Sequence, residues 1–143
     1  MLRVRGLVLC AVVLGFGCNP EPATDAGVDA GPEVCVAFPE RLTADYTVEK
    51  GCWLVLKTPV LSAGITVTMK PGAKLVFSAG TELTISADQV LSATGTAEQP
   101  ILLTGSLPVR GHWKGLSFEG TATASHLAYV TIEYGGDTTS DST

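Results

Sequence analysis

The chain has little positive charge, and this shortage excludes one class of partner. Its 143 residues include nine Lys and Arg residues against 14 Asp and Glu residues, and the formal net charge is −5 at pH 7. Arg3 and Arg5 lie at the extreme N-terminus, and the six basic residues between Tyr46 and Tyr134 are balanced by six acids. Because no basic stripe is available to neutralise phosphates, we expect no nucleic-acid partner.

Side chains that carry chemistry are also scarce and scattered. The acids between Tyr46 and Tyr134 stand singly, and no two occur at i and i+2 of one expected strand, where they would share a face. The only histidines are His112 and His126. His126 precedes an expected strand, which favours a polar surface position over a ligand role. The sequence therefore predicts no catalytic residue, no metal site and no cofactor.

One apolar run is present, and it lies near the N-terminus. Leu7–Phe16 is a run of about ten residues that follows Arg3 and Arg5, and it is too short to span a bilayer as a mature helix. A positive start followed by such a run is typical of a secretory signal. Cys10 lies inside this run and is expected to be a hydrophobic residue there.

The end of this run, Gly17-Cys18, resembles a bacterial lipoprotein signal, in which a small residue precedes a cysteine that becomes lipidated. The resemblance implies a signal peptide over residues 1–17 and a lipid (diacylglycerol and palmitate) on Cys18. It further implies an exported protein anchored to a membrane of the cell envelope, at the outer membrane or the cell surface. An ordinary cleaved signal and an uncleaved anchor remain alternatives.

Residues 18–33 are expected to form an acidic, flexible tether after the anchor. The stretch has no large apolar residue except Val28, and it carries three prolines and four acids. Such a composition buries too little surface to offset the entropy of ordering. Asp25 and Asp29 begin two Asp-Ala-Gly repeats, but a calcium loop needs six or more oxygen ligands. We therefore interpret the stretch as a spacer.

If Cys18 is lipidated, Cys35 and Cys52 remain as a pair in the exported domain. An exported compartment is oxidising, and an even pair there most often forms a disulfide. We predict that this disulfide ties a capping segment, residues 34–45, onto the first strand near Trp53. The alternative, a metal pair, lacks further Cys or His residues nearby.

Short apolar clusters recur from residue 65 to residue 103 and alternate with Thr, Ser or Lys, with Gly and Pro between them. Period-2 alternation indicates half-buried strands. Ile65, Leu83 and Ile101 are each 18 residues apart, which suggests a coil of rungs over residues 46–136. Outward positions would include Thr66, Thr68, Thr81 and Thr84. Inward positions would be Ile65, Val67, Leu75, Phe77, Leu83, Ile85, Ile101, Leu103, Leu116, Phe118, Leu127, Val130 and Ile132.

Three stretches of the sequence resemble those of a known family. They are residues 65–77 with a Pro-Gly-Ala corner, residues 90–104 with a Gly-Thr and a Pro-Ile, and residues 112–135 with a Trp-x-Gly followed by two tyrosines. They resemble the right-handed parallel β-helix of the pectin-lyase-like superfamily, in particular exported bacterial members of unknown activity. The alternative fold is an antiparallel β-sandwich, although Asn-Gly and Asp-Gly hairpin signals are absent between the clusters.

The last residues do not look like a cap. A solenoid needs a covered or polar terminal repeat, and residues 137–143 are expected to be a loop or a frayed tail. The sequence thus indicates an N-terminal portion of a longer β-helix.

The most functional-looking cluster is Arg110, His112, Trp113 and Lys114, which we predict as possible ligand contacts. An exposed Trp beside cations could stack on a sugar ring, but the Trp also recurs in the family's rung pattern, which favours a structural role. The favoured function is a non-catalytic, lipid-anchored envelope protein that presents a surface to polysaccharides or envelope proteins. The resemblance also allows an enzyme that cleaves acidic polysaccharides, with its site in missing C-terminal rungs, or a truncated remnant.

Overall fold

The computed structural model describes residues 33–120 and 124–136. The predicted signal peptide, the lipidated Cys18, nearly all of the tether and the tail at 137–143 lie outside the described residues. The described residues from Val34 onward belong to one compact unit, and the account below concerns that unit.

This unit is all-β. Its described residues form short strands and no helix. The strands are β1 (Val36–Ala37), β2 (Arg41–Leu42), β3 (Tyr46–Val48), β4 (Gly51–Val55), β5 (Val60–Leu61), β6 (Thr66–Met69), β7 (Ala73–Phe77), β8 (Glu82–Ile85), β9 (Val90–Thr94), β10 (Ile101–Gly105), β11 (Gly115–Phe118), β12 (His126–Ala128) and β13 (Val130–Ile132).

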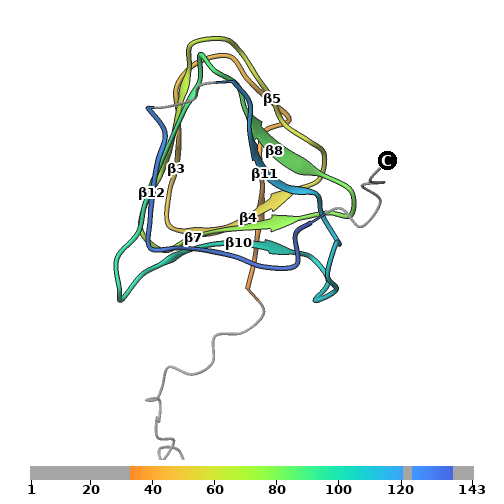
Figure 1. Cartoon of the computed structure of the whole chain (residues 1–143). Coiled ribbons are helices and arrows are strands. Elements are labelled where there is room, and N and C mark those ends of the chain that lie inside the picture. Colours follow the sequence, from red (N-terminus) through yellow and green to blue (C-terminus); the bar gives the residue numbers. More distant parts are fainter. Residues whose placement is uncertain (1–32, 121–123, 137–143) are drawn as a thin grey trace, which may run out of the picture. The chain divides into compact units, whose positions relative to one another are not determined.

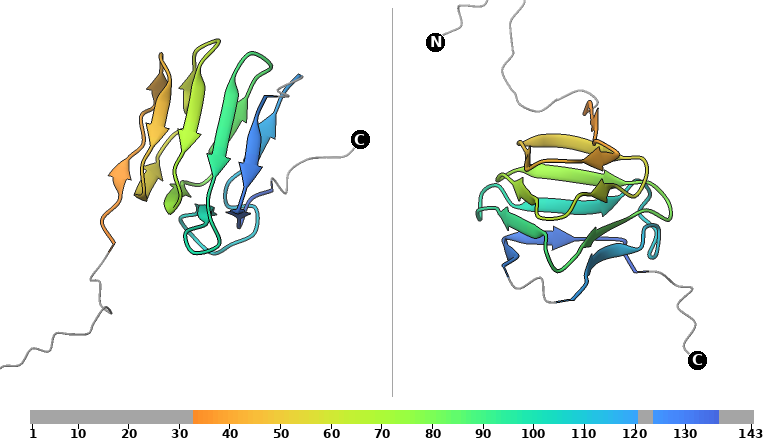
Figure 2. Two further views of the ribbon diagram at one scale, coloured as in Figure 1. Left: turned by 90° about the vertical axis from the view of Figure 1, so that its left-hand side faces the viewer. Right: turned by 90° about the horizontal axis from the view of Figure 1, so that it is seen from above.

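Every ladder between these strands is parallel. One sheet has the order β1-β4-β7-β10-β13, a second has the order β12-β9-β6-β3, and two pairs, β2-β5 and β11-β8, complete the set. Each strand pairs with the third strand before or after it, and the sheets lie on three sides of a shared interior (Figure 1). Successive turns of the chain lie side by side (Figure 2). For the described residues, the antiparallel sandwich is therefore wrong.

The 18-residue spacing of Ile65, Leu83 and Ile101 is not the distance between stacked residues. Residues that stand one above the other are separated by 21 positions from Tyr46 to Val67, 24 from Val67 to Leu91 and 28 from Leu75 to Leu103. Ile65, Leu83 and Ile101 instead belong to three different sides of the unit. Each of these residues lies two strands further along the chain than the one before it, so 18 residues correspond to less than one full turn.

The core follows the alternation in the sequence. In β7, Ala73, Leu75 and Phe77 are buried while Lys74 and Val76 are half-buried on the outer face. The predicted inward residues that are 5% exposed or less are Ile65, Val67, Leu75, Phe77, Leu83, Ile85, Ile101 and Leu103. Burying each such side chain contributes about 1.5–3 kcal/mol relative to exposure.

Some burial predictions are wrong. Phe118 is 41% exposed and Ile132 is 47% exposed, because β11 and β13 are the last strands of their sheets and no described strand lies over them. Leu116, Leu127 and Val130 are only partly buried for the same reason. Thr81, predicted to point outward, is buried, and its Oγ1 donates to the Ser78 carbonyl oxygen at 2.7 Å.

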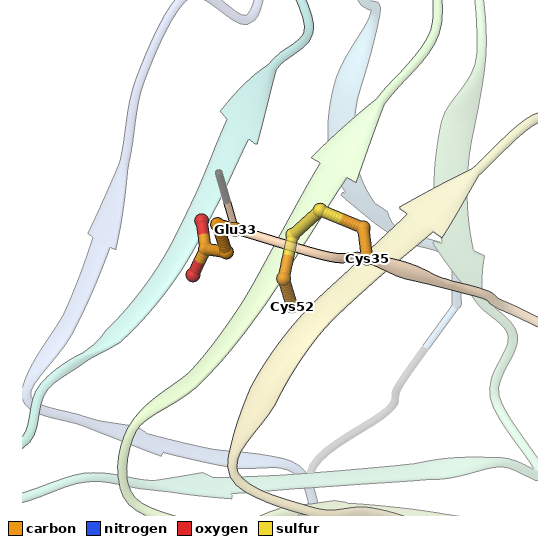
Figure 3. Close-up of side chains that lie close together, drawn as sticks. All are labelled: Glu33, Cys35 and Cys52. Carbon is orange, nitrogen blue, oxygen red and sulfur yellow. A yellow bond between two sulfur atoms is a disulfide. The ribbon is translucent and has the colours of Figure 1, made fainter. Parts of the chain in front are cut away.

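The predicted Cys35–Cys52 disulfide is present (Figure 3). Within residues 34–45, β1 pairs with β4 and β2 pairs with β5. The rings of Phe38, Tyr46 and Trp53 meet edge to face, with centroids 5.6–6.4 Å apart. Such edge-to-face contacts add to the stability gained from burial.

Candidate functional site

The predicted contact residues lie on the loop between β10 and β11, residues 106–114, here called the β10–β11 loop. Backbone hydrogen bonds fix this loop on both sides. The Gly80 amide donates to the His112 carbonyl oxygen at 2.9 Å, and the Lys114 amide donates to the Thr81 carbonyl oxygen at 2.8 Å. The His112 amide donates to the Tyr134 carbonyl oxygen at 3.0 Å. The loop is therefore held to the turn before β8 and to the segment after β13.

Trp113 is the anchor of this loop. Its side chain is 0% exposed and stacks on Phe77, with ring centroids 4.0 Å apart and planes 9° apart. Its Nε1 donates to the Glu133 carbonyl oxygen at 2.8 Å. A fully buried ring has no face to offer a sugar, so we remove Trp113 from the possible contacts and assign it the structural role.

The other predicted contacts are accessible. Arg110 is exposed, and His112 is half-buried with its Nε2 2.8 Å from Ser106 Oγ. Lys114 is exposed, and its Nζ lies 3.8 Å from a Glu82 carboxylate oxygen. The loop thus presents one exposed guanidinium, one hydroxyl–imidazole pair and one exposed ion pair of the kind that contributes about 0–1 kcal/mol to stability.

Two apolar side chains lie on the same loop. Leu107 and Val109 are each 55% exposed. Together with Arg110 and His112 they give the loop a mixed surface, with a cation, hydrogen-bonding groups and apolar patches. Such a surface suits contact with a sugar polymer or a protein, because both offer hydroxyl or acidic groups beside apolar faces.

One group of acidic and thiol side chains has its possible ligand atoms within 4.8 Å of one another in the described residues: Glu33, Cys35 and Cys52 (Figure 3). The two sulfurs are joined in the disulfide, and metal binding by cysteine requires the free thiolate. The disulfide therefore accounts for the close approach of the two sulfur atoms, and this group of side chains does not provide a metal centre.

A second polar surface was missed in the sequence. Four polar residues stand in register on β3, β6, β9 and β12 and form a continuous row, here called the polar row: Thr47, Thr68, Ser92 and His126. Their neighbours in each strand point inward, so the row lies on the outer face. His126 is exposed, as predicted. Only the strand register, which the sequence does not reveal, brings these residues together.

An exposed aromatic side chain lies at the end of β12. Tyr129 is 62% exposed and has a φ of 53°, and its carbonyl oxygen accepts from the Ile101 amide at 2.9 Å. A non-glycine residue rarely adopts this conformation. Gly95 lets the Tyr129 carbonyl oxygen come this close to the backbone, since a Cβ at residue 95 would lie 2.8 Å from that oxygen. Tyr129, rather than Trp113, offers a ring that a ligand can reach.

Comparison with protein-family models, curated proteins and solved structures finds no match to this chain. Among the residues that the structure describes, no helix has the length and apolar character needed to cross a membrane.

Proposed function

We propose that the unit is a right-handed parallel β-helix of the pectin-lyase-like kind. Its parallel ladders and the three-strand interval between paired strands support this proposal. In such a solenoid each turn contacts only its neighbours, and a continuous core forms by stacking. The columns of buried side chains, such as Leu75 above Leu103, are consistent with that arrangement.

The protein is further proposed to be a lipoprotein of a bacterial cell envelope, anchored through Cys18. The basic start, the short apolar run and the Gly17-Cys18 pair support the anchor. The Cys35–Cys52 disulfide fits the same proposal, because disulfides persist in exported, oxidising compartments. A cysteine that carries both a diacylglycerol and a palmitate would hold the chain at a membrane far more stably than a single acyl chain.

Its function, in this proposal, is to present a binding surface without catalysing a reaction. The observation that carries the proposal is the β10–β11 loop, which the buried Trp113 anchors to the core and which carries the accessible Arg110 and His112. A loop fixed in this way loses little conformational entropy when a ligand binds. Arg110 recognises carboxylates well because its guanidinium donates two parallel hydrogen bonds, so an acidic polysaccharide is the favoured ligand and an acidic protein surface is the alternative.

Isothermal titration calorimetry with polygalacturonate, a soluble acidic polysaccharide, tests the proposal. We expect saturable binding, and we expect Arg110→Gln to weaken it about tenfold, since a charge-assisted hydrogen bond contributes about 1.5–3 kcal/mol. Lys70→Gln is the matched control, because it removes one exposed cation from a different turn. Dextran serves as the neutral polymer and should not bind.

Two results would contradict this function. Equal weakening by Arg110→Gln and Lys70→Gln would mean that binding follows net charge and not this loop. Release of soluble sugar products from the polysaccharide would favour the enzyme alternative. Binding to an envelope protein, with none to the polysaccharide, would select the protein-binding form of the proposal.

A further inference from the structure

The polar row crosses a sheet whose strands carry no acidic or strongly basic side chain. Its four strands, β3, β6, β9 and β12, contain no Asp, Glu, Lys or Arg. The other strand groups do contain such residues, for example Lys74 on β7, Glu82 on β8 and Arg41 on β2. A ligand on these strands finds no ion-pair partner there, so electrostatic complementarity favours an uncharged ligand over a polyanion.

The row is accessible on its outward side. Val67, Met69 and Leu91 point into the core of the same sheet, so the residues between them point away from it. At the two ends of the row the side chains are exposed, and in the middle they are half-buried. The four strands lie side by side on the side of the unit that faces the viewer in the left view of Figure 2. A ligand can therefore reach the whole row.

The hydrogen-bonding groups of the row are not used within the unit. No hydrogen bond joins any of its four side chains to another residue in the described part of the chain. Other hydroxyls do have such partners: Thr84 Oγ1 donates to a Glu82 carboxylate oxygen at 3.4 Å, and Ser106 Oγ lies 2.8 Å from His112 Nε2. A hydroxyl or an imidazole can both donate and accept. The row therefore offers donors and acceptors that are free to bind a ligand.

The spacing of the row fits an extended polymer. Neighbouring strands of a sheet lie about 4.8 Å apart, and the register places one polar side chain on each of the four strands. Successive sugars in an extended β-1,4-linked polysaccharide follow one another at nearly this spacing. A chain laid across the strands thus brings one sugar to each polar side chain. An α-1,4-linked chain of the same sugar coils and does not keep this match.

We propose that the polar row binds a neutral, β-1,4-linked polysaccharide whose chain runs across the strands. The hydroxyls of Thr47, Thr68 and Ser92 exchange hydrogen bonds with sugar hydroxyls, and His126 does the same through its imidazole. A single hydrogen bond adds little net affinity, so binding requires several sugars to be engaged at once. This site lies on a different sheet from the β10–β11 loop, and the inference does not rest on the acidic ligand proposed for that loop.

Isothermal titration calorimetry of the full chain with cello-oligosaccharides, which are soluble β-1,4-linked glucose oligomers, tests the proposal. We expect the affinity to rise from cellobiose to cellotetraose, because four sugars fill the four positions of the row, and to level off at cellohexaose. Maltohexaose is the matched control ligand, since it contains the same sugar in α-1,4 linkage, and it should not bind.

Variants within the row locate the site. Thr68→Val and Ser92→Ala each remove one hydroxyl from the middle of the row, and each should weaken cellohexaose binding about two- to tenfold. Thr84→Val is the matched control, because it removes an outward hydroxyl from β8, on another side of the unit, and it should leave the affinity unchanged. Circular dichroism confirms that the variants keep their fold.

Four results would overturn the proposal. Cellohexaose that fails to bind at about 1 mM would do so directly. Equal binding of maltohexaose would mean that the strand spacing does not select the ligand. Equal weakening by Thr68→Val and Thr84→Val would place the ligand away from the row. Loss of cellohexaose binding in Arg110→Gln would place it on the β10–β11 loop, and the proposed function of that loop would then stand without this second site.

Discussion

Trp113 lies flat on Phe77, with the ring centroids 4.0 Å apart, and donates its indole N–H to the Glu133 carbonyl oxygen. This one side chain joins three turns of the chain: its own loop, the core position of β7 and the segment after β13. The indole is amphipathic, so its apolar faces fill the core while its single donor satisfies a backbone acceptor. The loop that presents Arg110 depends on this anchor.

Substitution of Trp113 should therefore lower the free energy of unfolding and should remove no direct contact with a ligand, because the side chain is buried. Trp113→Ala should reduce the free energy of unfolding by about 3–5 kcal/mol, because it leaves a cavity against Phe77. Trp113→Phe keeps the ring but removes the donor, and it should reduce that free energy by about 1–3 kcal/mol.

Urea unfolding followed by circular dichroism measures these changes. Arg110→Gln is the control, and it should stay within about 0.5 kcal/mol of the parent because Arg110 is exposed. A Trp113→Ala protein as stable as the parent would contradict the structural role of this residue.

Alternation of residue types was sufficient to predict the inward residues of strands that have a neighbour on both sides, such as Leu75 and Phe77 of β7, because inward side chains at every second position are a local property of a strand. It did not predict the exposure of Phe118 and Ile132, which depends on whether another strand lies over them. It could not predict the stacking distance, since loops of different length leave stacked residues 17 to 34 positions apart in the sequence. The polar row was missed for the same reason, because its residues come together only through the register between turns. Trp113 was placed among possible contacts because a loop position suggests exposure, whereas the stack on Phe77 depends on a turn 36 residues earlier.

The disulfide should contribute to stability through the unfolded state. Cys35 and Cys52 are separated by 17 positions, and in the chain-entropy model closing a loop of this size is worth about 3 kcal/mol. The double variant Cys35→Ser with Cys52→Ser should therefore unfold at a lower urea concentration than the parent.

Thiol labelling of the denatured, unreduced protein checks the premise. Neither Cys35 nor Cys52 should react until a reductant is added. If both are labelled without reduction, the bridge does not form in solution and the stability prediction fails with it.

The lipid anchor predicts where the protein is found in the cell. Cys18→Ser removes the thiol that would carry the lipid, so the protein should move from the membrane fraction to the soluble fraction. Cys10→Ser is the matched control, because Cys10 lies within the apolar run and should not carry a lipid. Fractionation followed by immunoblotting measures both, and a Cys18→Ser protein that still sediments with membranes would contradict the anchor.

Gln89 holds together the side of the unit where strand pairing is interrupted. No ladder joins β5 to β8 in the described part of the chain. The buried Gln89 side chain, 6% exposed, bridges this gap: its Oε1 accepts from the Ser86 amide at 2.8 Å, and its Nε2 donates to the carbonyl oxygens of Leu61 and Ser62 at 2.9 and 3.2 Å.

Gln89→Leu should therefore be costly although it is close in size and more apolar. It leaves backbone groups on both turns without a partner, at about 1–3 kcal/mol for each group that water cannot reach. Gln99→Leu, at an exposed position, should change the free energy of unfolding by less than about 0.5 kcal/mol. Hydrogen exchange adds a local readout: in Gln89→Leu the Ser86 amide should exchange faster, whereas the amides of β7 should keep their protection. Unchanged exchange at Ser86 would mean that this bridge does not form in solution, and that the gap between β5 and β8 is held by the core alone.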